Sequence, residues 1–174
     1  MTPVMALGIL SGSQMPLPLA GAFVLITMVL SDITLGLVML HAPWNTSHAF
    51  LAFSVLTPFV YGSIAVSLLI AKKFLWGSTS LLRTNAIAVV SALQFWVVTN
   101  FAVWLCSGMY PMTSQGLADC FALALPFLKW QLLGDVVYST AALLVYRLVI
   151  NKIKFFRSGE RGPLLNQDSL DASP

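Results

Sequence analysis

The feature that most constrains this sequence is the near absence of charge from most of its length. Asp32 is the one formally charged side chain in residues 1–71, and no Lys or Arg occurs between Arg83 and Lys129. Charged residues make up 9 % of the chain, against about 25 % in an ordinary soluble domain. A water-soluble fold could not cover its surface with so few charges, and a nucleic-acid-binding protein would need a basic stripe that this sequence lacks. The sequence therefore predicts an integral protein of the cell membrane, in contact with the lipid bilayer.

The apolar stretches predict how the chain crosses the bilayer, whose hydrocarbon core needs roughly 20 helical residues. Segments 3–12 and 115–128 are too short to cross. We expect them to form a short N-terminal helix and a short helix that lies in the outer interface or re-enters from it. Four stretches are long enough for full spans: 17–40, 49–71, 84–105 and 131–150. Strand-like alternation does not persist, which disfavours a barrel. The predicted fold is an all-α polytopic transmembrane helix bundle over residues 1–157, followed by a polar, disordered tail at 158–174.

The positions of Lys and Arg predict the orientation, because cytoplasmic loops carry an excess of basic residues. Lys72, Lys73 and Arg83 flank one loop, and further basic residues gather at and after the end of the last span. The loops at 41–48 and 106–114 contain no Lys or Arg, so we expect them to face outward. The C-terminus is then cytoplasmic, which requires that the short segment before the last span does not cross.

Four polar side chains lie inside the predicted spans, namely Asp32, Gln94, Asn100 and Asp135. A carboxylate at mid-bilayer costs at least about 2.5 kcal/mol and by default marks a functional site. At 1.5 Å per helical residue, Asp32, Asn100 and Asp135 lie roughly 12, 8 and 6 Å below the outer ends of their helices. Gln94 lies deeper, near the middle. Three polar groups from three helices are therefore expected to share one layer in the outer half of the bilayer.

Aromatic residues on the same helical faces extend this layer. Trp96 and Trp104 flank Asn100 at i, i+4, i+8 spacing, and Tyr138 lies one turn after Asp135. If these faces meet, they form a pocket for a small amphipathic or cationic ligand, held by cation–π and charge-assisted contacts. The alternative is that the polar groups cap or bridge helices and only stabilise the bundle. Both interpretations stay open at this point.

Two weaker patterns favour ordinary interpretations. Gly8 and Gly12 are four residues apart, which permits a close helix contact, although a flexible chain end is the favoured alternative. His41 and His48 bracket a predicted outer loop, but two histidines are too few for a zinc site. We expect no metal and no cofactor.

Several stretches, in this order and spacing, resemble a family of small, mainly bacterial integral membrane proteins: Thr2-Pro3-Val4, Leu30-Ser31-Asp32 with Leu35-Gly36, Thr99-Asn100-Phe101-Ala102-Val103-Trp104, Met109-Tyr110-Pro111, and Leu133-Gly134-Asp135 with Tyr138. The resemblance covers about residues 2–140. The family carries no established activity, and its shared polar positions correspond to Asp32, Asn100, Tyr110 and Asp135. Its plan is similar to the substrate-binding S components of energy-coupling factor (ECF) vitamin transporters. The resemblance also implies one further helix before Thr2, which we expect this chain to lack.

These observations predict a transporter subunit that binds a small solute in an outward-facing pocket. The predicted ligand-binding residues are Asp32, Trp96, Asn100, Trp104, Tyr110, Asp135 and Tyr138. The sequence contains no nucleotide-binding motif, so active uptake would need energising partner subunits. An enzyme is not expected, because no nucleophile–base pair or metalloprotease motif is visible. The alternative function is a structural or assembly subunit of the membrane with no small-molecule ligand.

Overall fold

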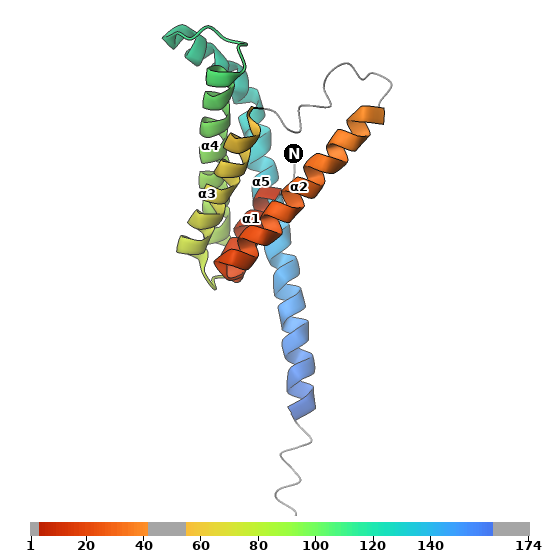
Figure 1. Cartoon of the computed structure of the whole chain (residues 1–174). Coiled ribbons are helices and arrows are strands. Elements are labelled where there is room, and N and C mark those ends of the chain that lie inside the picture. Colours follow the sequence, from red (N-terminus) through yellow and green to blue (C-terminus); the bar gives the residue numbers. More distant parts are fainter. Residues whose placement is uncertain (1–3, 42–54, 162–174) are drawn as a thin grey trace, which may run out of the picture.

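The computed structural model describes residues 4–41 and 55–161, and within these ranges every element is a helix. The elements are α1 (Val4–Gln14), α2 (Leu17–His41), α3 (Thr57–Leu75), α4 (Leu81–Cys106) and α5 (Ser114–Arg161) (Figure 1). Helices α2 to α5 are long and apolar enough to cross a membrane, whereas α1 is shorter. The predicted all-α bundle with four spans and a short N-terminal helix is therefore confirmed.

The predicted helix at 115–128 is wrong as a separate element, because it forms the first part of α5. This helix runs for 48 residues without interruption. Leu and Ala, which are good helix formers, surround Pro126 on both sides, so the proline bends the helix instead of ending it. Figure 1 shows the first turns of α5 inclined against the rest of the helix. The full length is about 72 Å at 1.5 Å per residue, more than twice the thickness of a hydrocarbon core of about 30 Å.

Two other predicted boundaries shift. The predicted span 49–71 corresponds to α3, which begins at Thr57 and ends at Leu75, while residues 42–54 lie outside the described ranges. Pro58 occupies the first turn of α3, where a missing N–H breaks no intrahelical bond. The predicted tail begins inside α5, since this helix continues to Arg161. The remainder of the predicted tail lies outside the described residues.

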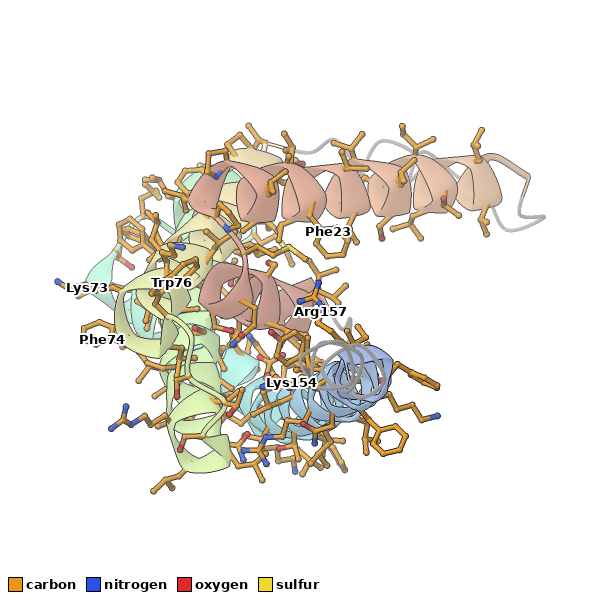
Figure 2. All side chains as sticks on the ribbon, turned by 90° about the horizontal axis from the view of Figure 1, so that it is seen from below. Phe23, Lys73, Phe74, Trp76, Lys154 and Arg157 are labelled. Atoms are coloured by element: carbon orange, nitrogen blue, oxygen red, sulfur yellow. The ribbon has the colours of Figure 1, made fainter. Side chains whose placement is uncertain are left out.

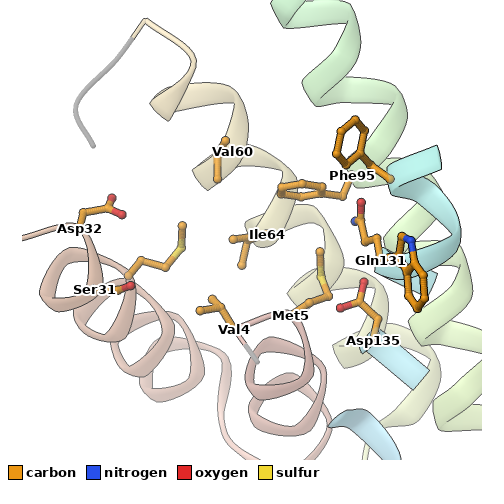
Figure 3. A pocket seen from close by; sticks show the side chains of 12 residues that line it. Val4, Met5, Ser31, Asp32, Val60, Ile64, Phe95, Gln131 and Asp135 are labelled. Atoms are coloured by element: carbon orange, nitrogen blue, oxygen red, sulfur yellow. The ribbon is translucent and has the colours of Figure 1, made fainter. Parts of the chain in front are cut away.

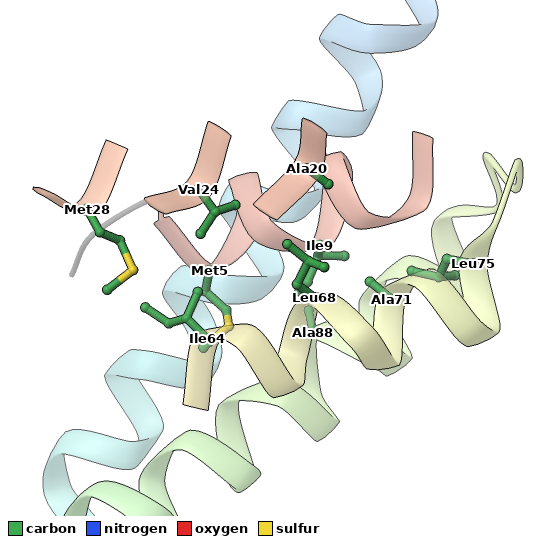
Figure 4. Packing of buried hydrophobic residues seen from close by; sticks show 10 residues of the cluster. All are labelled: Met5, Ile9, Ala20, Val24, Met28, Ile64, Leu68, Ala71, Leu75 and Ala88. Carbon is green, nitrogen blue, oxygen red and sulfur yellow. The ribbon is translucent and has the colours of Figure 1, made fainter. Parts of the chain in front are cut away.

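Helix α1 lies at the centre of the bundle and packs against all four other helices. Its residues Met5 and Ile9 join a buried cluster with apolar side chains from α2, α3 and α4 (Figure 4). The members of this cluster are Met5, Ile9, Ala20, Val24, Met28, Ile64, Leu68, Ala71, Leu75 and Ala88. A helix that is contacted on every side must be apolar or small on every side, as the sequence of α1 is.

Small residues let α1 and α3 approach closely. A Cβ atom on Gly12 would lie 2.7 Å from the backbone oxygen of Leu68 and 3.3 Å from the Cβ of Ala71. At Gly8 the nearest atom would be the Cγ2 of Ile64 at 3.8 Å, an ordinary contact distance. The close helix contact is therefore made at Gly12, and the favoured alternative of a flexible chain end is wrong.

Hydrogen bonds tie the end of α1 to the turn between α3 and α4. The Gln14 side-chain amide donates to the Ser78 carbonyl at 2.9 Å, and the Gly77 N–H donates to the Ser13 carbonyl at 2.9 Å. Gly77 has φ of +68°, a left-handed conformation that glycine adopts without steric cost. Lys72 donates to the carbonyl of Met15 at 3.0 Å. We call this end of the bundle the basic end.

Helix α2 diverges from the other long helices as it leaves the basic end (Figures 1 and 2). It contacts α1 and α3, and most of its surface carries exposed apolar side chains such as Leu19, Leu25, Ile26 and Leu30. Exposing so long an apolar surface to water would be unfavourable, whereas lipid tails cover it without cost. The apolar helices thus indicate a membrane protein in contact with the bilayer.

Candidate functional site

A cavity of about 420 Å³ lies where α2 diverges from the rest of the bundle (Figure 3). All five helices contribute to its wall, and most of the side chains are apolar or aromatic. The lining residues are Val4, Met5, Met28, Ser31, Asp32, Val60, Ile64, Phe95, Phe127, Trp130, Gln131 and Asp135. The volume falls within the usual range of small-molecule sites, about 300–1,000 Å³. Two of the predicted site residues, Asp32 and Asp135, are thereby brought to one cavity.

Asp135 is the most unusual residue of this cavity. It is 7 % exposed, and among the described residues its Oδ2 atom has no hydrogen-bond partner. Phe127 and Gln131 precede it at i, i+4, i+8 spacing on α5, so the three side chains share one face of that helix. Figure 3 shows the Gln131 amide beside the Asp135 carboxylate. Buried carboxylates are normally paired, whereas Asp135 lines the cavity with one buried oxygen that has no hydrogen-bond partner among the described residues.

Asp32 lies on the opposite wall, on α2, and it does have a partner. The Tyr61 hydroxyl donates to its Oδ2 atom at 2.7 Å. This bond joins α2 to α3 in the part of α2 that diverges from the bundle. The hydroxyl–carboxylate bond therefore fixes the position of Asp32 relative to α3.

The electrostatic character of the cavity is negative and weakly shielded. Among the described residues that line it, Asp32 and Asp135 are the charged ones, and none is Lys, Arg or His. Phe95, Phe127 and Trp130 supply aromatic surface, whose ring faces attract cations. The surrounding apolar side chains lower the local polarity and so strengthen any charge interaction inside. This arrangement suits a small ligand that carries positive charge or hydrogen-bond donors.

Trp96 and Asn100, two of the predicted ligand-binding residues, do not line the cavity. The Trp96 indole donates to the Ala124 carbonyl of α5 at 3.2 Å, and the Asn100 amide donates to the Trp96 carbonyl at 2.8 Å. Cys120 donates to the Asn100 carbonyl at 3.4 Å. These groups are covered by the first turns of α5, the segment that the sequence placed in the outer interface. The Trp96 indole and the Asn100 amide nitrogen thus have their hydrogen-bond acceptors within the protein.

The other three predicted aromatic residues also lie outside the cavity. Trp104 donates from its indole to the Pro111 carbonyl at 3.0 Å, within the loop between α4 and α5. Tyr110 is half-buried in the same loop. Tyr138 is 40 % exposed on α5, although it lies one turn from Asp135. The layer predicted from depth therefore divides into a cavity and a separate packed region near this loop.

Several cavity residues were not identified from the sequence, although spacing could have indicated some of them. Met28 precedes Asp32 by one turn, and Phe127 precedes Gln131 by one turn, so a search for neighbours on the carboxylate faces would have found them. Phe95, and Tyr61 as the partner of Asp32, could not be found in this way, because their helices meet Asp135 and Asp32 only through the tertiary fold.

A second polar cluster lies between α3 and α4. The Gln94 amide nitrogen donates to the Ser63 hydroxyl at 2.7 Å, and the Ser67 hydroxyl donates to the Gln94 Oε1 at 3.3 Å. Buried polar groups that are mutually satisfied in this way hold helices together and need no ligand. This cluster has the character of structural polar contacts.

Replacing Gln94 with methionine is expected to lower the free energy of unfolding by about 1–2 kcal/mol, because two interhelical hydrogen bonds are lost at about 0.6 kcal/mol each and Ser63 loses its donor. The loss is measured by SDS titration of the purified protein in detergent micelles. Gln115→Met is the control, since Gln115 is exposed and bonds to Asp119 of its own helix. Equal stabilities of the two variants would contradict a structural role of Gln94.

The comparison with curated proteins and the comparison with solved structures gave no match. One family is matched over nearly the whole chain, including all five helices up to Ser158. The matched region contains the cavity and every residue that lines it. The model of the family of unknown function DUF6580 matches residues 1–158, and the chain therefore belongs to this family.

Proposed function

We propose that this protein binds a small solute in the cavity between α2 and α5 and serves as the solute-binding subunit of a membrane transport system. The observation that carries the proposal is Asp135, a buried carboxylate that lines a cavity of ligand size and has one oxygen without a hydrogen-bond partner among the described residues. A carboxylate oxygen without a partner is energetically unfavourable inside a membrane bundle. A ligand that binds to it would offset this cost. The proposal follows the sequence resemblance, which implied a plan similar to that of an ECF S component.

A structural or assembly subunit is the alternative function. It accounts well for Gln94, Trp96 and Asn100, whose side-chain N–H groups donate to neighbouring helices or to their own helix. It does not account for the cavity, nor for the Asp135 oxygen that has no partner among the described residues, because polar contacts between helices stabilise a bundle only when both partners are present. The solute-binding function is therefore the better supported of the two.

The proposed orientation places the basic end in the cytoplasm, in agreement with the excess of Lys and Arg expected there. Lys72, Lys73 and Arg83 lie at this end, and Arg147 donates to the Thr79 carbonyl in the turn between α3 and α4. Asp32 lies 15 residues beyond Leu17, the first residue of α2, which is about 22 Å along the helix. The cavity is then in the outer half of the bilayer, open to a solute from outside.

In this orientation, the cavity and the C-terminal part of α5 have different roles. Most of the described lining residues are apolar or aromatic, as is usual for small-molecule binding sites, so we propose binding and not catalysis. Energy for uptake would come from partner subunits. The C-terminal part of α5 extends past the basic end (Figure 1) and, in the proposed orientation, reaches into the cytoplasm where such partners act.

A thermal-shift screen tests the proposal on purified protein in detergent, with a panel of small amines, amino acids, vitamins and neutral solutes. At least one solute is expected to raise the melting temperature of the wild type, and Asp135→Ala is expected to abolish that shift. Asp119→Ala is the matched control, because Asp119 is an exposed aspartate of the same helix that does not line the cavity. Identical shifts in the wild type and Asp135→Ala for every active solute would rule out this site.

A further inference from the structure

The two carboxylates of the cavity lie on opposite walls and do not converge on one point. Asp32 projects from α2 and Asp135 from α5, and Figure 3 shows Val4, Ile64 and Met5 between them. The middle of the cavity is thus apolar, while both ends carry an acceptor with negative charge. A ligand that matches this pattern has two polar ends and an apolar centre.

The described residues that line the cavity supply no counter-ion for the charges at its two ends. None of the described lining residues is cationic, and the partner of Asp32 is the neutral Tyr61 hydroxyl. Asp135 is more than nine-tenths buried and keeps Oδ2 unpaired. In a poorly shielded interior, two carboxylates without a cationic partner among the described lining residues favour a ligand that brings one positive charge to each.

A single metal ion does not fit this arrangement. Divalent cations need several oxygen ligands that converge to within about 2.0–2.6 Å of one point, and apolar side chains separate these two carboxylates. The described residues also contain no group of three or more His, Cys, Asp or Glu side chains that could hold a metal ion. The same separation argues against a compact monocation, which could reach one carboxylate but not both.

We propose that the ligand is a linear organic dication, with two ammonium groups joined by an apolar chain. One ammonium group pairs with Asp135 and contacts the aromatic wall of Phe95 and Trp130, and the other pairs with Asp32. The methylene chain lies across Val4, Met5 and Ile64. This inference rests on the proposed solute-binding function and specifies the chemical class of the solute.

Isothermal titration calorimetry of the full chain in nanodiscs tests the ligand class with three matched series. These are linear α,ω-diamines from propane to octane, the n-alkylamines of equal length, and the corresponding α,ω-diols. The best diamine is expected to bind at least about tenfold more tightly than its monoamine, and affinity is expected to peak at one chain length. Such a peak arises because only one spacing between the two ammonium groups reaches both carboxylates without strain. The peak can be measured on the wild type alone.

Variants then assign the two ends of the ligand. Asp32→Asn and Asp135→Asn, which keep the side-chain shape, are each expected to reduce diamine affinity to the monoamine level, whereas Asp119→Asn leaves it unchanged. Diamines that bind no better than monoamines or diols would overturn the dication, and so would stabilisation by Mg²⁺ or Ca²⁺ alone that requires both aspartates. The solute-binding function survives either result if Asp135→Ala still abolishes the response to the active solute. A complete lack of binding by any solute would defeat both proposals.

Discussion

Asp135→Leu is expected to raise the free energy of unfolding of the unliganded protein by about 1–3 kcal/mol, the usual cost of a buried polar group without a partner. The wild-type carboxylate is 7 % exposed and has an unpaired Oδ2 atom. Leucine removes this cost, and the adjacent cavity leaves room for its extra methyl groups. The same change is expected to abolish solute binding, so that stability and function move in opposite directions, as is common at functional sites.

Asp32→Leu provides the contrast for this prediction. Asp32 accepts a hydrogen bond from Tyr61 at 2.7 Å, so its removal leaves that hydroxyl without its partner and separates α2 from α3. We expect the free energy of unfolding to fall by about 1 kcal/mol or more. SDS titration of both variants and the wild type measures the difference. A loss of stability in Asp135→Leu as large as that in Asp32→Leu would mean that Asp135 is a structural contact, as the alternative function requires.

Gly12→Leu is expected to lower the free energy of unfolding by about 3 kcal/mol, at the upper end of the usual cost of overpacking. Even a Cβ atom at this position would lie 2.7 Å from the Leu68 backbone oxygen, and a backbone atom cannot move aside as a side chain can. The strain would separate α1 from α3. Because α1 packs against every other helix, the whole bundle would be loosened.

Gly21→Leu is the matched control for this substitution. Gly21 lies inside α2, and a Cβ atom there would meet nothing within 4 Å. Leucine has a better helix propensity than glycine by up to about 1 kcal/mol, so this variant is expected to keep or gain stability. Thermal unfolding and SDS titration of both variants distinguish the strain at the close contact from the general effect on stability of replacing a glycine in a helix. Equal behaviour of the two variants would contradict the close approach of α1 and α3.

The sequence alone was sufficient for the class of the fold and for two residues of the candidate site. Long apolar stretches with almost no charge can fold in a membrane only as helices that satisfy their own backbone hydrogen bonds, and this is what α2, α3 and α4 do. Asp32 and Asp135 stand out for a related reason, since a carboxylate in an apolar span is too costly to be incidental. The structure brings both of them to one cavity.

The sequence was misleading wherever the outcome depended on packing between helices. Residues 115–128 looked too short and too interrupted to belong to a span, yet they continue as α5 through Pro126. Because these turns pack on α4, Trp96 and Asn100 are used in contacts within the protein. Depth along the helices had placed Asn100 beside the aspartates, but depth does not specify the direction in which a helical face points.

Hydropathy and charge by themselves therefore determined that this protein is a membrane helix bundle and that Asp32 and Asp135 are its exceptional residues. Each of these conclusions depends on the transfer of single side chains or segments into a low-dielectric medium, which is a local property. Only the tertiary structure decided that the two carboxylates face one cavity from opposite walls, that Tyr61 holds one of them, and that the aromatic face of α4 is closed by α5. These relations depend on how helices cross and bend, and such crossings are determined by packing among residues far apart in the chain.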